Sequence, residues 1–321
     1  MKVTAIAESF PLAQAFVIAR GARTHAEVVR VCIEQGGYVG QAECVPYSRY
    51  GESVASVLAQ IEGLPTRFER CSLAQLLPPG AARNAVDCAL WDLAAKQAGQ
   101  PVWQLAGLAQ PQPQITAYTL SLDEPEQMFA MAQREAQRPV LKIKLGTADD
   151  LPRLQAVRAG APHSTLIVDA NEGWSAATYE QLLPELVALS VSMIEQPLPA
   201  ADDSMLNDLP RPITLCADES CHDRASLPAV TARYDMINIK LDKTGGLTEA
   251  LALRQAAEGL GLRIMVGCML GSSLAMAPAV LLAQGAEITD LDGPLLLAQD
   301  RTPSLYYDAL GVHPPTAELW G

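Results

Sequence analysis

The sequence predicts an α/β fold in which a parallel β/α barrel follows a smaller α+β module. The barrel is indicated by short apolar runs that end in charged residues and recur at steps of 25, 26, 23 and 22 residues, at Lys144, Asp169, Glu195, Asp218 and Lys240. One strand, one helix and their loops occupy about that much chain. Residues 1–112 lack this period, and 321 residues, 49% of them hydrophobic, suffice for a barrel plus a small module.

The first module, residues 1–112, reads as a mixture of strands and helices. Its β-rich runs are expected to be strands, the last two joined as a hairpin by Gly36-Gly37: Lys2–Glu8, Ala15–Arg20, Ala26–Gln35 and Tyr38–Cys44. Helical periodicity follows in three segments: Glu52–Ile61, Ser72–Leu77 and Ala81–Gln97. Gly99 and Pro101 end the last of these helices.

From Gln114 onward, β-rich runs alternate with Leu- and Ala-rich helical segments, which places a barrel in residues 113–298. The eight expected strands are Ile115–Leu120, Val140–Leu145, Leu166–Asp169, Met193–Glu195, Ile213–Asp218, Met236–Lys240, Arg263–Met269 and Ile288–Leu291. The closing segment, residues 299–321, returns to hairpin-like composition. We expect it to fold back on the first module and complete it.

Composition excludes several classes of protein. A net charge of −13 and a pI near 4.8, with no Lys/Arg-rich stretch, argue against a nucleic-acid partner. No apolar run has membrane-spanning length, and Met1–Ala7 lacks the features of a signal peptide. Seven scattered cysteines without C-x-x-C spacing argue against disulfides or zinc. We therefore expect a cytoplasmic protein without a membrane partner.

Three carboxylates, Asp169, Glu195 and Asp218, end successive predicted strands of the barrel. Strand ends converge on one mouth of a barrel, so the three side chains should meet there. A lone carboxylate of this kind more often caps a loop. Three in register supply the oxygen ligands that a hard divalent cation prefers, so we expect a Mg²⁺ site.

Lysines flank these carboxylates in the strand order. Lys142 and Lys144 share one face of their strand, while Ile143 and Leu145 take the helix-covered outer face, so the lysines should point inward. Lys240 shows the same pattern on the other side. Other cations and a metal should lower a lysine pKa and supply a neutral amine. Two lysines across a metal suggest proton transfer on both sides of one carbon.

Other polar positions are less specific. Asp290 and Asp292 share one face at the end of the eighth predicted strand and could bind a cationic part of a substrate. Arg23 follows a strand, but surface arginines are common. None of the four histidines falls on a predicted strand end.

The motifs Lys-x-Lys, Asp-x-Asn, Glu-Gln-Pro, Asp-Glu-Ser and Asn-Ile-Lys, in this order and spacing, resemble those of the enolase superfamily over essentially the whole chain. That resemblance implies a modified (β/α)₇β TIM-type barrel with an α+β capping domain, and a Mg²⁺-stabilised enediolate formed by proton removal beside a carboxylate. A lysine on each side resembles the muconate lactonizing enzyme subgroup. The seventh predicted strand, Val266-Gly-Cys-Met269, has no histidine for the alternative His-Asp dyad.

Within that subgroup, four segments look like those of dipeptide epimerases acting on L-Ala-D/L-Glu: Phe16–Arg23, Pro46–Glu52, Asp242–Gly246 and Asp290–Gly293. The resemblance implies one Mg²⁺ per subunit, with Mn²⁺ as a substitute, and Lys144 and Lys240 as the two bases aided by Lys142. It also implies that Arg23 binds the glutamate side chain and that Asp290, with Asp292 nearby, binds the ammonium. The expected substrate site further contains Thr119, Cys268 and Met269.

The expected activity is epimerisation of the C-terminal residue of such dipeptides, in murein peptide metabolism, and an assembly of identical subunits is compatible with it. The alternatives are N-succinylamino acid racemase, o-succinylbenzoate synthase or a cycloisomerase, whose substrates carry no free ammonium. A barrel that has lost activity and serves as a scaffold is a further alternative, against which the intact lysines and carboxylates argue.

Overall fold

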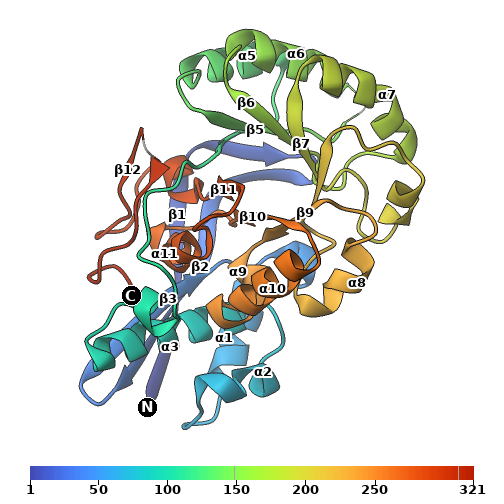
Figure 1. Cartoon of the computed structure of the whole chain (residues 1–321). Coiled ribbons are helices and arrows are strands. Elements are labelled where there is room, and N and C mark those ends of the chain that lie inside the picture. Colours follow the sequence, from blue (N-terminus) through green and yellow to red (C-terminus); the bar gives the residue numbers. More distant parts are fainter. Residues whose placement is uncertain (148, 310) are drawn as a thin grey trace.

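The computed structural model describes residues 1–147, 149–309 and 311–321. An N-terminal capping domain is built on a three-stranded antiparallel sheet, and an eight-stranded parallel sheet forms the barrel. In Figure 1 the capping strands, in blue, extend from the N-terminus toward the barrel. The predicted fold class is confirmed. The exact domain boundary at residue 112 stays a prediction.

The capping sheet has the order β1 (Lys2–Ile18), β2 (Gly21–Gln35) and β3 (Tyr38–Cys44). Gly36 and Gly37, both at positive φ, close the predicted hairpin between β2 and β3. The prediction of two separate strands before residue 20 is wrong. β1 loses its pairing with β2 between Pro11 and Phe16, but the chain stays extended because Leu12 bridges Leu297, just before the C-terminal tail.

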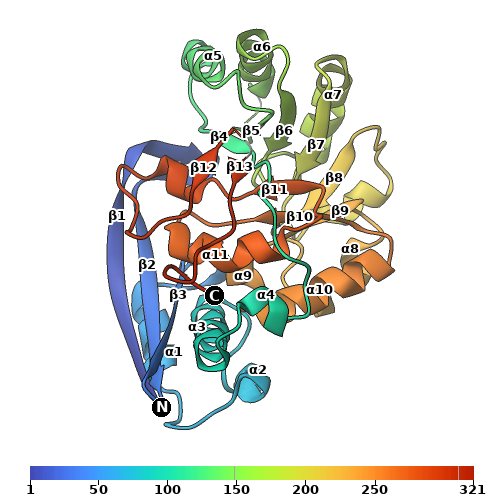
Figure 2. The ribbon, with the colours of Figure 1, turned by 60° about the vertical axis from the view of Figure 1, so that its left-hand side comes forward.

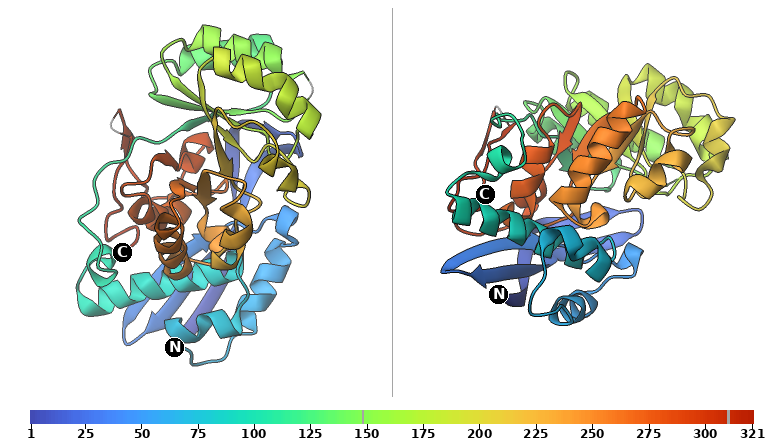
Figure 3. Two further views of the ribbon diagram at one scale, coloured as in Figure 1. Left: turned by 45° about the vertical axis from the view of Figure 1, so that its right-hand side comes forward. Right: turned by 60° about the horizontal axis from the view of Figure 1, so that its bottom comes forward.

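Helices of the capping domain lie close to their predicted positions: α1 (Val54–Glu62), α2 (Leu73–Leu76), α3 (Ala81–Ala98) and α4 (Val102–Leu105). The long helix α3 packs against β2 and β3 (Figure 3). It is buried along most of its length because small residues such as Ala85 and Ala89 allow close approach to the sheet. Among the described residues, no helix is both long and apolar enough to cross a membrane.

The barrel strands follow one another in chain order around the sheet: β4 (Tyr118–Leu120), β5 (Val140–Lys144), β6 (Thr165–Asp169), β7 (Val191–Glu195), β8 (Thr214–Ala217), β9 (Met236–Ile239), β10 (Arg263–Gly267) and β11 (Ile288–Asp290). A parallel bridge between Thr116 and Thr289 connects the last strand to the segment before the first. The first strand is shorter than predicted. Ile115 is 52% exposed, and only isolated bridges at Gln114 and Thr116 precede Tyr118.

Helices cover the outside of the barrel (Figures 1 and 2). They are α5 (Pro125–Arg134), α6 (Asp150–Gly160), α7 (Ala176–Ala188), α8 (Leu227–Val230), α10 (Leu247–Gly259) and α11 (Ser273–Leu282). The short helix α9 (Leu241–Thr244) lies instead at the carboxyl end of β9, against α3 of the capping domain. The outward strand residues, such as Ile143 and Val168, join the large core beneath the covering helices. The barrel therefore has an outer core that is separate from its interior.

The barrel interior is layered by the two-residue period of its strands. A buried apolar floor is formed by Ala117, Ile167, Met193, Cys216, Met236 and Met265. Two residues further along these strands, the next inward layer is polar or small: Thr119, Asp169, Glu195, Asp218, Asn238 and Gly267. The alternation that buries the floor therefore also brings the predicted functional side chains to the carboxyl end of the barrel.

The C-terminal tail contacts the capping domain. After the short strands β12 (Tyr307–Asp308) and β13 (Gly311–Val312), the Trp320 side chain is fully buried and donates from Nε1 to the Cys88 carbonyl of α3 at 3.0 Å. Arg301 binds Glu8 of β1 at 2.7 Å and also contacts Glu43 of β3. Figure 2 shows the C-terminus beside α3.

Candidate active site

The three predicted metal carboxylates lie on neighbouring strands and are almost completely removed from solvent. Asp169 and Glu195 are 0% exposed and Asp218 is 2% exposed. Asp169 pairs in register with both Lys144 of β5 and Glu195 of β7. Three buried negative charges this close together require positive charge among them.

Lysines supply that positive charge. Lys142 Nζ lies 2.7 Å from Glu195 Oε2 and 3.2 Å from Asp169 Oδ2. Lys144 Nζ lies 2.6 Å from Asp169 Oδ2, and Lys240 Nζ lies 2.7 Å from Asp218 Oδ2. The structure thus brings together all six residues predicted to form the catalytic and metal-binding centre.

A fourth buried lysine, Lys243, was not predicted from the sequence. Lys243 Nζ lies 2.6 Å from Asp218 Oδ1 and donates to the carbonyl oxygens of Asp218 and Asn238. It follows Lys240 by one turn of the short helix α9, in a segment noted only for its resemblance. A lysine one helical turn beyond a strand-end lysine points back toward the same site, and this spacing could have indicated it.

The pKa values reflect the burial of these groups and their mutual charges. Burial lowers the pKa of Lys240, but Asp218 and Glu195 outweigh burial and raise it well above its usual value. The pKa of Lys142 is likewise raised by Asp290, Glu195 and Asp169 despite burial. The lowering expected from the sequence is therefore not what these contacts produce, because each ammonium group faces carboxylates directly.

The pKa values of the carboxylates shift in opposite directions. Burial raises the pKa of Asp218, but Lys240 and Lys243 lower it well below its usual value. Burial and the charge of Asp169 raise the pKa of Glu195. The surroundings of Glu195 therefore disfavour its negative charge, whereas those of Asp218 favour it.

These residues fit a hard divalent cation. Among the described residues, no group of three metal-ligating side chains is arranged to hold a metal ion, because lysine ammonium groups contact the carboxylates. The donor set is nevertheless three carboxylates on adjacent strands, and buried Glu195 Oε2 has only the ion pair with Lys142 Nζ to balance its charge among the described residues. A divalent cation would add positive charge at this oxygen and offset the burial and the repulsion from Asp169 that raise the Glu195 pKa.

Neighbouring groups hold the carboxylates in place. Asn238 Nδ2 donates to Glu195 Oε1 at 2.7 Å, and Gln196 Oε1 accepts from the backbone N–H of Asp218 at 3.0 Å. Gly267 makes room for Asn238, because a Cβ at this position would lie 2.6 Å from the Asn238 amide oxygen. The glycine on the seventh strand is therefore needed for the orientation of Glu195.

A cavity of about 370 Å³ lies over this centre. Lys142, Lys144, Asp218 and Lys240 line it, together with all six predicted substrate residues: Arg23, Thr119, Cys268, Met269, Asp290 and Asp292. The capping domain closes the other side with Phe16 and Tyr47. Residues of both the capping domain and the barrel therefore form the cavity.

The two ends of the cavity carry opposite charge. Asp290 Oδ2 accepts from Lys142 Nζ at 2.8 Å, whereas buried Asp290 Oδ1 has no partner among the described residues. Burial and Asp290 raise the pKa of Asp292 to about 6, and its Oδ2 accepts from the Thr119 N–H at 2.6 Å. Arg23 stacks over the Tyr47 ring at 5.0 Å and makes no ion pair within the described part of the chain.

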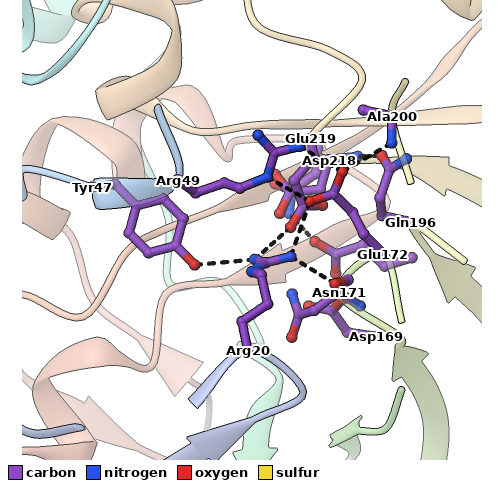
Figure 4. A network of polar contacts seen from close by, with 12 residues as sticks. Arg20, Tyr47, Arg49, Asp169, Asn171, Glu172, Gln196, Ala200, Asp218 and Glu219 are labelled. Atoms are coloured by element: carbon purple, nitrogen blue, oxygen red, sulfur yellow. Dashed lines mark hydrogen bonds and ion pairs between the residues drawn. The ribbon is translucent and has the colours of Figure 1, made fainter. Parts of the chain in front are cut away.

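A second polar network beside the cavity was not predicted (Figure 4). Arg20, in the turn between β1 and β2, donates to Glu219 Oε1 at 2.7 Å and to the Asn171 carbonyl at 2.6 Å. Glu172 receives both Arg20 and Arg49. The sequence analysis gave these residues no role, because the partners are about 30 to 200 positions apart.

Comparison with known proteins assigns the family. The family model for the mandelate racemase/muconate lactonizing enzyme N-terminal domain matches residues 1–107, and the enolase C-terminal domain-like model matches residues 127–301. The chain belongs to the enolase superfamily. Enzymes of this superfamily use Mg²⁺, in agreement with the oxygen donors described above.

Two curated relatives match nearly the whole chain. L-Ala-D/L-Glu epimerase of Escherichia coli is 47% identical over 95% of this chain and 97% of its own length. N-acetyl-D-glutamate racemase of a Pseudoalteromonas species is 46% identical over 92% of this chain and 95% of its own length. Both are isomerases, and so is this enolase-superfamily member.

Solved structures of dipeptide epimerases and their homologues have the same fold as this chain. An enolase family member from Agrobacterium tumefaciens with homology to dipeptide epimerases, solved with sodium and L-Ala-L-Glu, has a TM-score of 0.97, 54% identity and 99% coverage of both chains. A dipeptide epimerase from Cytophaga hutchinsonii, in complex with Mg and D-Ala-L-Val, has a TM-score of 0.90 and 28% identity, covering 97% of this chain and 91% of its own.

Proposed function

We propose that this enzyme epimerises the C-terminal residue of dipeptides such as L-Ala-L-Glu. The observation that carries the proposal is the charge arrangement of the cavity, with unpaired Asp290 Oδ1 on the barrel side and Arg23 on the capping side. A dipeptide ending in glutamate brings an ammonium group and a side-chain carboxylate that match these two charges. Its α-carboxylate belongs at the centre formed by Asp169, Glu195 and Asp218.

The chemistry is a proton exchange at the α-carbon by two bases. Lys144 on β5 and Lys240 after β9 flank the three strands that carry the carboxylates, so they approach a bound substrate from opposite sides. One lysine removes the α-proton, and the other delivers a proton to the opposite face. Lys142 adds positive charge near the substrate carboxylate.

The metal site of this proposal consists of Asp169, Glu195 and Asp218. When bound, Mg²⁺ supplies positive charge that stabilises the carboxylate of the deprotonated substrate, and Mn²⁺ is the expected substitute. The proposed setting is the metabolism of murein peptides in the cytoplasm. Assembly into a homo-oligomer stays a prediction.

A second candidate function, racemisation of an N-acylated amino acid, is favoured by the relative named N-acetyl-D-glutamate racemase. An N-acyl substrate has no ammonium group, so it would leave Asp290 Oδ1 buried and unpaired. Loss of a charge-assisted hydrogen bond to a buried carboxylate costs on the order of 2–5 kcal/mol. The Asp290 contact thus separates the two candidates.

The test is α-proton exchange in deuterated water, followed by mass spectrometry, with L-Ala-L-Glu, N-acetyl-L-Ala-L-Glu and N-acetyl-L-glutamate. We expect kcat/KM to fall at least about 30-fold for the acetylated dipeptide and for Asp290→Asn acting on L-Ala-L-Glu. Chelation should stop exchange, and added Mg²⁺ should restore it. Equal or better turnover of N-acetyl-L-glutamate would instead assign the racemase function.

A further inference from the structure

One barrel carboxylate, Glu172, accepts hydrogen bonds from two arginines, which belong to two separate loops of the capping domain (Figure 4). Arg20 Nη1 donates to Glu172 Oε2 at 3.2 Å. Arg49, in the short helix Ser48–Tyr50, donates from Nε to Oε2 at 2.7 Å and from Nη2 to Oε1 at 2.8 Å. The N–H of Ala200 donates to Oε1 at 2.9 Å. Glu172 thus accepts four hydrogen bonds, while its side chain is only 8% exposed.

The backbone that presents Glu172 is strained. Asn171 and Glu172 have φ values of 46° and 67°, so two consecutive residues with side chains adopt the left-handed region. Such conformations persist where surrounding contacts fix them, often at functional sites. Here Arg20 donates to the Asn171 carbonyl, and the Asn171 N–H donates to Asp169 Oδ1 at 2.9 Å. The strained turn therefore connects the capping loop to the catalytic centre.

Contacts continue from this turn to the substrate cavity. Arg20 Nη2 donates to the Tyr47 hydroxyl at 3.0 Å. The Tyr47 ring lies under the Arg23 guanidinium, 5.0 Å from its centroid. Arg23 belongs to the same β1–β2 hairpin as Arg20 and pairs in register with Phe16. The position of Arg23 over the cavity therefore depends on where Arg20 and Tyr47 are held.

We infer that Glu172 is a positioning residue that fastens both capping loops to the barrel and thereby sets the place of Arg23 in the cavity. Because one carboxylate accepts both arginines, losing it removes the two-contact pair with Arg49 and loosens Arg20, which keeps its bonds to the Asn171 carbonyl and to Glu219. The identity of the group that Arg23 binds rests on the proposed function. The fastening itself rests only on the contacts of Glu172.

Hydrogen exchange measured by mass spectrometry on the full chain tests the fastening. Glu172→Met keeps the side-chain length and removes every acceptor, and Glu172→Gln keeps the shape should the first variant fold poorly. We expect exchange to rise about tenfold in segment 46–52, where both Arg49 bonds are lost, and about threefold in segment 16–24, where Arg20 loses one bond of several. Arg49→Gln should affect mainly segment 46–52.

The matched control is Glu249→Met, which breaks another two-contact Arg–Glu pair: Arg224 contacts both oxygens of Glu249 at 2.9 Å, away from the cavity. It should change exchange only around its own helix and around Arg224, whose N–H also donates to Glu249. Exchange within about twofold of wild type in both capping segments of the Glu172 variants would overturn the proposal, because the lost contacts would then hold nothing.

Kinetics test the link to Arg23. Glu172→Gln should raise KM for L-Ala-L-Glu about tenfold with little change in kcat or in the constants for L-Ala-L-Leu. In Arg23→Ala, adding Glu172→Gln should cause no further loss; a full additional tenfold loss would show that Glu172 does not act through Arg23. If wild type turns over neither dipeptide, the proposed function is wrong, while the exchange measurement still decides the fastening.

Discussion

At the residue scale, the two proposed bases differ in what surrounds them. Lys144 Nζ pairs with Asp169 and lies 5.9 Å from the centroid of the Phe16 ring of the capping domain. Lys240 pairs with Asp218, and burial together with the charge of Asp218 raises the pKa of the nearby Tyr50 hydroxyl. Each lysine thus forms an ion pair with one carboxylate of the barrel and lies near an aromatic ring of the capping domain.

The two-base mechanism predicts that the lysines are not interchangeable. Lys144→Ala should block α-proton exchange from one enantiomer of the C-terminal residue and Lys240→Ala from the other, each by about 10²–10⁴-fold. Exchange of L-Ala-L-Glu and L-Ala-D-Glu in deuterated water, followed by proton NMR, measures this directly. Lys2→Ala, at an exposed position, is the control. Intact epimerisation in either active-site variant would contradict the mechanism.

At the element scale, the short helix α9 connects the catalytic centre to the capping domain. It begins directly after Lys240 and carries Lys243 to Asp218. On the same helix, Asp242 Oδ1 accepts from the Val45 N–H at 3.0 Å and from Asn84 Nδ2 at 2.8 Å. Burial raises the pKa of Asp242 to about 7, against the opposing effect of these two hydrogen bonds.

The raised Asp242 pKa predicts a pH-dependent loss of stability. Between about pH 4 and pH 7 the folded protein holds a proton on Asp242 that the unfolded chain has released, so this group's contribution to stability falls as pH rises through that window. Asp242→Asn keeps the acceptor and cannot ionise. We expect its free energy of unfolding, relative to wild type, to increase between pH 5 and pH 8 by on the order of 3 kcal/mol.

Urea unfolding at pH 5 and pH 8 measures this difference. The other titrating groups contribute equally to the pH dependence of variant and wild type, so their contribution cancels in the comparison. Asp208→Asn, on the exposed surface, is the control and should show no such change. Identical pH dependence of wild type and Asp242→Asn would mean that Asp242 ionises in the folded protein at its ordinary pH.

At the scale of the whole molecule, the C-terminal tail holds the capping domain in place beside the barrel. Just before the tail leaves the barrel, Leu297 bridges Leu12 of β1, and within the tail Arg301 binds Glu8. It ends with Trp320 in the core beneath α3 and with the Gly321 N–H donating to Asp92 Oδ1 at 2.8 Å. The first and last parts of the sequence therefore share one core.

Trp320→Ala should be strongly destabilising. Removing a fully buried tryptophan leaves a cavity and leaves the Cys88 carbonyl without its Nε1–H donor, so we expect a loss of about 3–5 kcal/mol in the free energy of unfolding. Urea unfolding measures it, with Leu260→Ala, at a side chain 58% exposed, as the control that should change stability by about 0.5 kcal/mol or less. A loss no larger than the control's would contradict the role of the tail.

The sequence by itself determined the barrel, its strand ends and the residues that meet there. The inward direction of Lys142, Lys144, Asp169 and Glu195 follows from the two-residue period of a strand, which is a local property of the chain. The recurring step between strands is local as well. The family resemblance then indicated Arg23, Asp290 and Asp292, which the structure places in one cavity.

Only the tertiary structure decided the contacts between distant segments. The pairing of Leu12 with Leu297 keeps β1 continuous, and the binding of Arg20 and Arg49 by Glu172 joins loops more than 100 residues away. The raised pKa of Lys240 depends in the same way on Asp218, which another strand supplies. Periodicity fixes the direction of a side chain relative to its own strand or helix, whereas its partner and its charge environment are fixed only when separate elements pack together.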